Sequence, residues 1–378
     1  MSARPLAVAA EDACRLALAA SLPPAPCADS AAVLRHLGLL QLDPLTRVDK
    51  AHRLACLARM DPGASARAVD APLWAPGQAA AFEAWVHAAC LVPVEDWPLL
   101  RLARERALAS PKRPRREILD QVRALIEASP GGATISQIEQ PGTATRGWDW
   151  SEHKHATEHM LRTGELVCSA RRDARRVFDL PERRVPARLL DARPAREEIL
   201  AAMAARALAA LGIATAADIA AYYNITPALA REGLEAADAW PAAVQGWSVP
   251  AWLPRGASGP PVTAAREPVL VGPFDNLIWD RDRTRRIFGF DYLFEAYKPQ
   301  AKRKYGYYVL ALVADGAFLG RADIRRDPGT LSVLAGFPEP ATDQARFKAR
   351  LHTAVVRLER QLGLAGQDVG WRCGRRRR

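Results

Sequence analysis

The stretch Leu39-Leu40-Gln41-Leu42-Asp43 decides how this 378-residue chain is interpreted. It follows a helical pattern that ends at Gly38, and its composition predicts an extended segment. Alternate side chains of an extended chain point the same way, so Gln41 and Asp43 should share one face about 7 Å apart while Leu40 and Leu42 face the core. An amide that holds a water, beside a carboxylate that polarises it, is the minimum equipment for hydrolysis through a cationic transition state.

The composition is that of an ordinary globular protein, with 49% hydrophobic and 25% charged residues. No apolar run is long enough to cross a bilayer, and Glu11 and Asp12 interrupt the N-terminal apolar stretch where a signal peptide would continue. We therefore expect a cytoplasmic protein. The six cysteines are scattered and form no C-x-x-C, which argues against a disulfide framework and a zinc ribbon.

The excess positive charge is concentrated in two short stretches. The chain carries a formal charge of +11; residues 281–304 hold eight Lys/Arg against three Asp/Glu, and the last eight residues hold five Arg and no acid. Charge gathered in this way indicates a polyanionic partner, and nucleic acid is the usual one, so we expect association with the nucleoid. The alternative for Arg375 to Arg378 is a disordered tail that serves solubility.

A recurring order of three helices and a short hairpin indicates related domains. In the copy expected over 111–188 the helices span Arg116–Ser129, Ile135–Glu139 and a segment from the cap Ser151 to Thr163, where Gly164 ends it. Strands are expected over Glu165–Ala170 and Arg175–Leu180, with a turn over 171–174. Three helices followed by a two-stranded wing make a winged-helix domain.

Two further copies and a different C-terminal region complete the organisation. Residues 189–260 should hold helices over Glu197–Leu211, Thr215–Tyr223 and Thr226–Ala237, with a possible wing from Trp247. Residues 1–110 should hold helices over Val8–Ser21 and Asp29–Leu37, the extended segment, and further helices to about Leu108. Residues 261–365 should form three strands, over Tyr305–Val313, Phe318–Ile324 and Thr330–Phe337, with a helix over Asp343–Leu362 packed across them. Residues 366–378 should form a basic tail. The expected fold class is α+β, with about three tandem winged-helix domains.

Four sequence blocks, in order over about residues 10–340, carry a resemblance to a known family. They are Leu39–Asp43 followed by Asp49–Leu54, Phe82–Ala89, Gly272–Arg281 and Lys302–Tyr308. Together they resemble the winged-helix DNA glycosylases of the AlkZ/YcaQ type, which release alkylated bases and open interstrand crosslinks. The resemblance implies that tandem winged helices form a concave DNA channel and that Gln41 and Asp43 are the catalytic pair. The family has a version of this motif ending in Gln and one ending in Asp; this chain has the Asp version, followed by Pro44 where a small polar residue is expected.

The chemistry fits the residues without the family. Alkylation at N7 makes a purine cationic and a good leaving group, and cleavage of the C–N bond passes through an oxocarbenium-like sugar. Asp43 could stabilise that cation and activate water while Gln41 orients the water. We therefore expect a monofunctional, metal-independent and cofactor-independent DNA glycosylase, monomeric, acting on double-stranded DNA with N7-alkylated purines and crosslinks. The alternative is a non-enzymatic winged-helix transcriptional regulator.

Several cationic and imidazole side chains are candidate DNA contacts. Those near the catalytic segment are Arg47, Lys50, His52, Arg53 and His87; those of the middle domain are His155, His159, Arg171, Arg172 and Arg175; those of the C-terminal region are Arg281, Lys302, Arg303 and Lys304. A solvated helix face is the alternative for Lys50, a structural histidine for His87, and an exposed charged hairpin for the wing arginines.

The remaining candidates are interpreted as structural. Trp85, Phe274 and Trp279 are expected in the core, and Asp275 and Asn276 are expected to hold a turn. His155 and His159 lie one helical turn apart while His153 falls off their face, so a zinc site would need ligands from elsewhere and a metal-dependent hydrolase is the weaker alternative.

Overall fold

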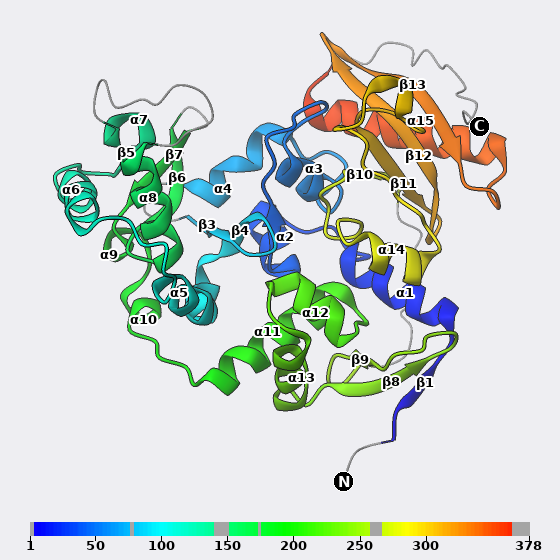
Figure 1. The fold of residues 1–378 in the computed structure, drawn as a ribbon. Coiled ribbons are helices and arrows are strands. Elements are labelled where there is room, and N and C mark those ends of the chain that lie inside the picture. The colour runs from blue at the N-terminus through cyan, green and yellow to red at the C-terminus, as the bar shows by residue number, and fades with distance from the viewer. Residues whose placement is uncertain (1–3, 76–78, 140–150, 173–174, 258–266, 365–378) are drawn as a thin grey trace.

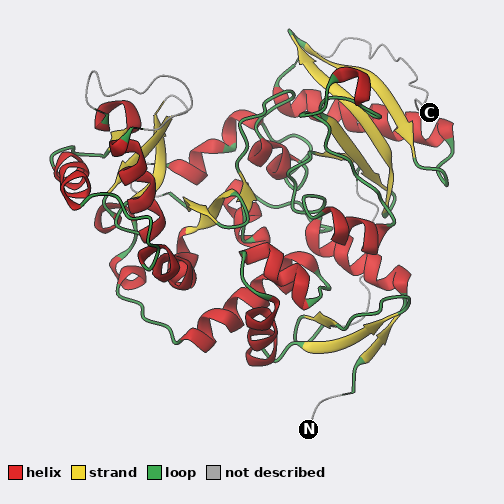
Figure 2. Cartoon of the chain, in the orientation of Figure 1, coloured by secondary structure: helices red, strands yellow, loops and turns green. Residues whose placement is uncertain are grey.

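The computed structural model describes residues 4–75, 79–139, 151–172, 175–257 and 267–364, and shows an α+β architecture (Figure 1). Among these residues the strands form four sheets, in the orders β1-β8-β9, β2-β4-β3, β5-β7-β6 and β10-β11-β12-β13. Helices surround and separate the sheets (Figure 2). The expected basic tail, 366–378, lies outside the described residues.

The N-terminal region combines helices with a central three-stranded sheet. Its elements are β1 (Leu6–Val8), α1 (Ala10–Ser21), α2 (Ser30–Leu37), β2 (Leu40–Gln41), α3 (Ala51–Leu57), η1 (Ala66–Ala68), α4 (Asp70–Trp74), β3 (Ala81–Trp85), β4 (Ala89–Pro93), η2 (Val94–Leu100) and α5 (Arg101–Leu108). Asp29 caps α2, because its side chain accepts the Ala32 N–H, and Gly38 ends that helix in the left-handed region.

The prediction of further helices from the extended segment to about Leu108 is wrong at residues 81–93, which form the antiparallel hairpin β3–β4. Glu83 explains the difference, because its buried carboxylate accepts hydrogen bonds from Trp74 and from Arg171, far away in the sequence. Such partners make a strand stable where local propensity does not favour one. The strand β1 was also unexpected, and it pairs in parallel with β8.

The region 111–188 contains the predicted helices and strands. They are α6 (Arg116–Glu127), α7 (Ile135–Ile138), α8 (Glu152–Thr163), β6 (Val167–Arg172) and β7 (Arg175–Asp179). The strand β5 (Ala133–Thr134) and the short helices α9 (Pro181–Arg184) and α10 (Ala187–Leu190) were not predicted. Ser151 caps α8 and Gly164 ends it, as predicted. Ile118, Val122 and Ile126 of α6 are buried in a core built from this region alone. Part of the predicted turn, residues 173–174, lies outside the described residues.

The third region contains α11 (Arg196–Leu211), α12 (Ala216–Tyr223), α13 (Pro227–Ala236), β8 (Trp240–Val244) and β9 (Ala251–Leu253). Thr215 and Thr226 cap α12 and α13, as predicted. The predicted wing from Trp247 is misplaced, because Trp247–Val249 lie in the loop between β8 and β9. Gly246, at a positive φ of 80°, starts that loop after β8.

The C-terminal region is a four-stranded antiparallel sheet with one long helix across it (Figure 1). Three of these strands and the helix were predicted, and the strand at residues 269–271 was not. It comprises β10 (Val269–Val271), α14 (Arg281–Phe288), η3 (Gln300–Lys302), β11 (Val309–Ala314), β12 (Ala317–Asp327), β13 (Thr330–Pro338) and α15 (Gln344–Leu362). Asp315 and Gly316 both have positive φ, which is the geometry of the tight hairpin turn that their sequence predicts.

Buried residues show which regions share a core. The C-terminal sheet and α15 pack on residues of α2, α3, α4 and the β2–β4 sheet in one apolar cluster. A second cluster joins the other face of that sheet to α11, α12 and α13. The small β2–β4 sheet therefore lies between the two largest cores, and Figure 1 shows it at the centre of the molecule. The boundaries proposed at 110, 188, 260 and 365 stay a prediction.

Candidate active site and nucleic-acid interface

Strand β2, which carries Gln41, is held between two cores. Leu40 pairs with Leu91 and Gln41 with Cys90 of β4, and the Leu42 N–H donates to the Ala89 carbonyl at 2.8 Å. Leu40 is buried in the core of the C-terminal sheet, whereas Leu39 is buried in the core of α11–α13. This is the predicted alternation of an extended chain, and it leaves Gln41 and Asp43 half-buried.

Asp43 has a carboxyl group suited to an active site. Burial raises the pKa of Asp43, and a hydrogen bond from the Leu45 N–H (2.9 Å) partly opposes that rise. The charge of Asp43 also contributes to raising the pKa of Tyr308, after the larger effect of burial. Asp43 therefore lies near the residue that precedes β11, although 265 positions separate the two residues (308 minus 43).

The block Gly272–Arg281 fixes the backbone on which Gln41 sits. The buried Asn276 donates from Nδ2 to the Leu39 carbonyl (2.9 Å) and to the Tyr222 hydroxyl (2.7 Å), and that hydroxyl donates to the Leu37 carbonyl (2.6 Å). These bonds satisfy both carbonyls at the junction of α2 and β2. Asn276 lies in a turn, as expected, and its side chain also holds the backbone at Leu39, the start of the segment Leu39–Asp43.

Asp275 anchors the same block to the protein interior. Its two carboxylate oxygens accept from Arg59 Nη1 and Nη2, each at 2.8 Å, and Oδ1 also accepts the Leu277 N–H. The hydrogen bond from the Leu277 N–H forms the predicted turn. The contact with Arg59 is a bidentate, fully buried ion pair that ties the end of α3 to the loop after β10.

His87 borders the segment as a packed, uncharged ring. It stacks on Trp279 with ring centres 4.0 Å apart and planes 8° apart, and it lies beside Cys90, the partner of Gln41. Burial lowers the pKa of His87 to about 4, so the imidazole is neutral at pH 7. Of the two alternatives for His87, the structure favours a packing role next to the site.

Lys50, His52 and Arg53 all contact one carboxylate, that of Asp70. The distances from Asp70 are 3.2 Å to Lys50 Nζ, 3.1 Å to His52 Nε2 and 2.6 Å to Arg53 Nη2. Burial alone would raise the pKa of Asp70, but the hydrogen bonds from His52 and Arg53 outweigh it and hold that pKa well below its usual range. The His52 side chain is only 4% exposed, so its predicted DNA contact is not supported.

Arg47 and Arg303 lie together against one aromatic ring. The Arg47 guanidinium lies 5.6 Å from the ring centre of Tyr307, and the Arg303 guanidinium lies 4.9 Å from the same ring. Lys302 and Lys304 are exposed next to Arg303. The structure therefore brings the predicted C-terminal cations together with Arg47 of the N-terminal region.

Arg281 is a correction among the predicted DNA contacts. Its guanidinium donates to the carbonyls of Ile278 and Pro273 and lies 4.6 Å from the ring centre of Tyr292. Burial lowers its pKa. The neighbouring Arg283 and Arg286 likewise contact the carbonyl of Leu211 and the carboxylate of Asp218, so the basic run at 281–286 largely serves the fold.

The candidate DNA contacts of the middle region differ in their exposure to solvent. Arg172 and Arg175 are exposed at the end of the β6–β7 hairpin, where the predicted wing lies, and His155 is exposed on α8. Arg171 instead donates to Glu83 of β3 at 2.7 Å and lies 5.1 Å from the ring centre of Trp74. Its contact joins the middle region to the hairpin β3–β4.

Comparison with known proteins identifies this architecture. The family model for DNA glycosylase AlkZ-like proteins matches residues 34–361. The chain belongs to this family. The solved structure of the Streptomyces sahachiroi DNA glycosylase AlkZ is similar, with a TM-score of 0.66 and 17% sequence identity over 99% of this chain and 100% of that one. At this identity the structural likeness is evidence of a shared fold.

Membership in the AlkZ-like family confirms the resemblance found in the sequence and makes this chain an enzyme of the DNA glycosylase class. It favours repair over transcriptional regulation. In the described part of this AlkZ-like protein, no three His, Cys, Asp or Glu side chains are grouped as a metal site would require. None of the described helices is long and apolar enough to span a bilayer.

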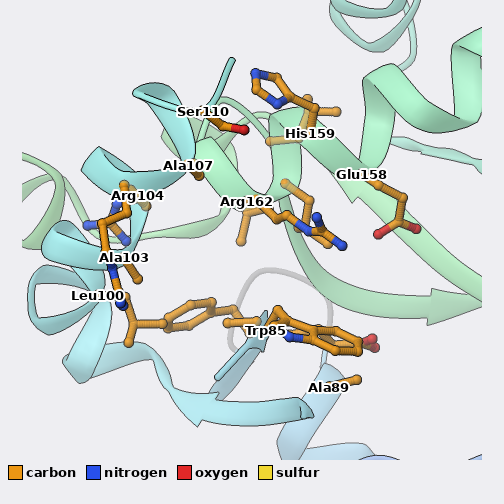
Figure 3. A pocket seen from close by; sticks show the side chains of 18 of the residues that line it. Trp85, Ala89, Leu100, Ala103, Arg104, Ala107, Ser110, Glu158, His159 and Arg162 are labelled. Carbon is orange, nitrogen blue, oxygen red and sulfur yellow. The ribbon is translucent and has the colours of Figure 1, made fainter. Parts of the chain in front are cut away.

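One feature of this AlkZ-like chain was missed from the sequence. A cavity of about 580 Å³ lies between β3, α5 and α8, and His159 and Arg162 line it (Figure 3). Trp85, which was expected in the core, also lines it and is 60% exposed.

Proposed function

We propose that this protein is a monofunctional DNA glycosylase that hydrolyses the N-glycosidic bond of N7-alkylated purines in double-stranded DNA. The observation that carries the proposal is the half-buried Asp43 carboxyl of raised pKa, two residues after Gln41, on a segment held by Asn276. We further propose that it acts as a monomer on chromosomal DNA in the cytoplasm, without a metal.

The reaction would proceed by departure of the base followed by addition of water. The C1′–N9 bond breaks and its electron pair goes to N9, which neutralises the cationic base. The Asp43 carboxylate stabilises the resulting oxocarbenium ion. A water held by the Gln41 amide then adds to C1′ and gives its proton to Asp43.

We propose that the α6–β5–α7–α8–β6–β7 unit is a winged helix whose hairpin arginines Arg172 and Arg175 contact phosphates. The DNA backbone near the lesion would be contacted by Arg47, Lys302, Arg303 and Lys304. Lys50 and Arg53 would lie farther from the DNA, behind these four side chains. A crosslinked base cannot be flipped fully into a closed pocket, since it remains joined to the other strand. An open channel between winged-helix units would accept it, and we therefore include crosslinks among the proposed substrates.

Release of 7-methylguanine from alkylated duplex DNA tests the catalytic pair. We expect Asp43→Asn to lower the single-turnover rate by about 10²- to 10⁴-fold, the size of a general acid–base contribution, and Gln41→Ala to lower it less. Asp61→Asn is the matched control, because Asp61 is exposed and its Oδ1 accepts the Gly63 N–H as Asp43 accepts that of Leu45. Gln245→Ala controls for Gln41, since Gln245 is exposed on the loop after β8.

Equal release by all these proteins would contradict the assignment of Gln41 and Asp43. If none releases the base and all bind one defined duplex sequence, the regulator interpretation holds instead. The same assay in EDTA tests metal independence, because a hydrolase that uses His155 and His159 would lose its activity there.

A further inference from the structure

The cavity between β3, α5 and α8 is separated from the catalytic segment by a single strand. Ala89 of β4 lines the cavity, and its carbonyl accepts the N–H of Leu42, between Gln41 and Asp43. Trp85 pairs with Ala89 across the hairpin β3–β4. A group bound in the cavity would therefore lie close to the proposed lesion site without occupying it.

The aromatic wall of the cavity is an exposed indole. Trp85 is 60% exposed, and the Arg162 guanidinium lies 5.9 Å from its ring centre. Figure 3 shows Arg162 of α8 above Trp85, with His159 beyond it. A large ring left in solvent next to a planar cation is suited to stacking on another planar ring, such as a nucleobase.

The lining of the cavity carries more positive than negative charge. Its charged residues are Arg104, Arg106, Lys112, Arg162 and Arg176 against Glu83 and Glu158. Glu158 pairs with Arg176, and Glu83 pairs with Arg171, which lies outside the lining. The side chains of Lys112 and Arg162 form no hydrogen bond or ion pair with any described residue, so both can receive an anion.

Two further groups of the lining, Arg104 and His159, are polar and partly or largely buried. Burial, followed by the nearby charges of Arg101 and Arg193, lowers the pKa of Arg104 to about 10, and Glu105 only partly opposes that shift. His159 Nε2 is buried without a hydrogen-bond partner among the described residues. Arg104 is held in place by Trp97, since its Nη2 donates to the Trp97 carbonyl at 2.9 Å and its guanidinium lies 4.4 Å from the ring centre of Trp97.

We propose that this cavity binds one unpaired nucleotide, with the base stacked on Trp85 and the phosphate held by Arg162 and Lys112. The volume of about 580 Å³ lies within the range of small-ligand sites, roughly 300–1,000 Å³. The inference rests on the proposed function: the nucleotide that loses its partner when the damaged base moves to Gln41 and Asp43 is one that needs such a site.

Binding measured by fluorescence anisotropy tests the cavity independently of catalysis. Wild-type protein should bind an undamaged duplex with a one-nucleotide bulge more tightly than the fully paired duplex. Trp85→Ala and Arg162→Ala should each reduce that preference about tenfold, which is the order of one base–aromatic stack. Trp85→Phe should retain most of it. The controls are Trp240→Ala, an exposed indole on β8, and Arg116→Ala, an exposed guanidinium on α6.

The outcomes separate the ligand sources and the two proposals. If free dGMP competes with DNA for the protein but the protein shows no preference for the bulged duplex, the cavity binds free nucleotides. That result would overturn the proposal that its ligand is an unpaired nucleotide of the DNA strand. An unchanged preference in folded Trp85→Ala and Arg162→Ala would overturn the site, even where Asp43→Asn still abolishes base release. Wild-type base release by Asp43→Asn would instead overturn the proposed function and leave the measured bulge preference standing.

Discussion

At the scale of single residues, the protonation of Asp43 should set the acid side of the pH profile. Burial raises its pKa, so the folded chain retains this proton to higher pH than an ordinary aspartic acid does. In the proposed mechanism base release needs the Asp43 carboxylate, so the rate should be full at neutral pH and fall as the pH drops through the raised pKa. Single-turnover release measured from about pH 4.5 to 8 should place this limb above the ordinary aspartate pKa of about 3.9.

The residual activity of Asp43→Asn provides the control, because it should lack that limb. His87 does not complicate the assignment in the neutral range, since its pKa is about 4 and its ring stays uncharged above that value. A limb that persists unchanged in Asp43→Asn would show that another group controls the acid side.

At the scale of elements, strand β2 depends on the loop after β10. Asn276 is buried and donates two hydrogen bonds, to Leu39 and to Tyr222. Asn276→Ala should lower the free energy of unfolding by about 1–3 kcal/mol, because buried acceptors lose their donor. It should also slow base release, because the backbone that positions Gln41 is no longer fixed. Thermal unfolding and single-turnover release together measure both effects.

The exposed amide of Gln245 supplies the matched variant, and Gln245→Ala should change neither quantity. Wild-type stability and wild-type release in Asn276→Ala would mean that the two cores alone hold strand β2. A loss of stability with an unchanged rate would limit Asn276 to a structural role.

At the scale of the whole molecule, the proposed DNA surface predicts a steep response to salt. Affinity for undamaged duplex should fall strongly between about 50 and 200 mM salt, because each neutralised phosphate releases counterions. The double variant Lys302→Ala/Lys304→Ala should reduce the slope of log K against log salt by about 1.8, or 0.9 per phosphate contact. Lys348→Ala/Arg360→Ala removes two exposed cations from α15 and should leave the slope unchanged. Equal slopes for both double variants would contradict the proposed surface.

Local signals in the sequence predicted most of the elements. Asp29, Ser151, Thr215 and Thr226 each cap the helix that follows, and Asp315–Gly316 forms the expected turn. Caps and tight turns act within a few residues, so the chain specifies them without its distant parts. The segment Leu39–Asp43 fits its local pattern in part: Leu39 and Leu40 are buried, whereas Leu42 is half-buried like Gln41 and Asp43.

Contacts between distant segments decided what could not be predicted. Glu83 is paired with Arg171 and Trp74, Arg281 is turned onto backbone carbonyls, and His52 is enclosed beside Asp70. Whether a charged side chain faces solvent or a buried partner depends on the free-energy cost of desolvating it and on which partner folding brings near. The local sequence pattern determines neither. For the same reason, the cationic cavity at Trp85 and the proximity of Asp43 to Tyr308 arise only when β3, α5, α8 and β11 are assembled.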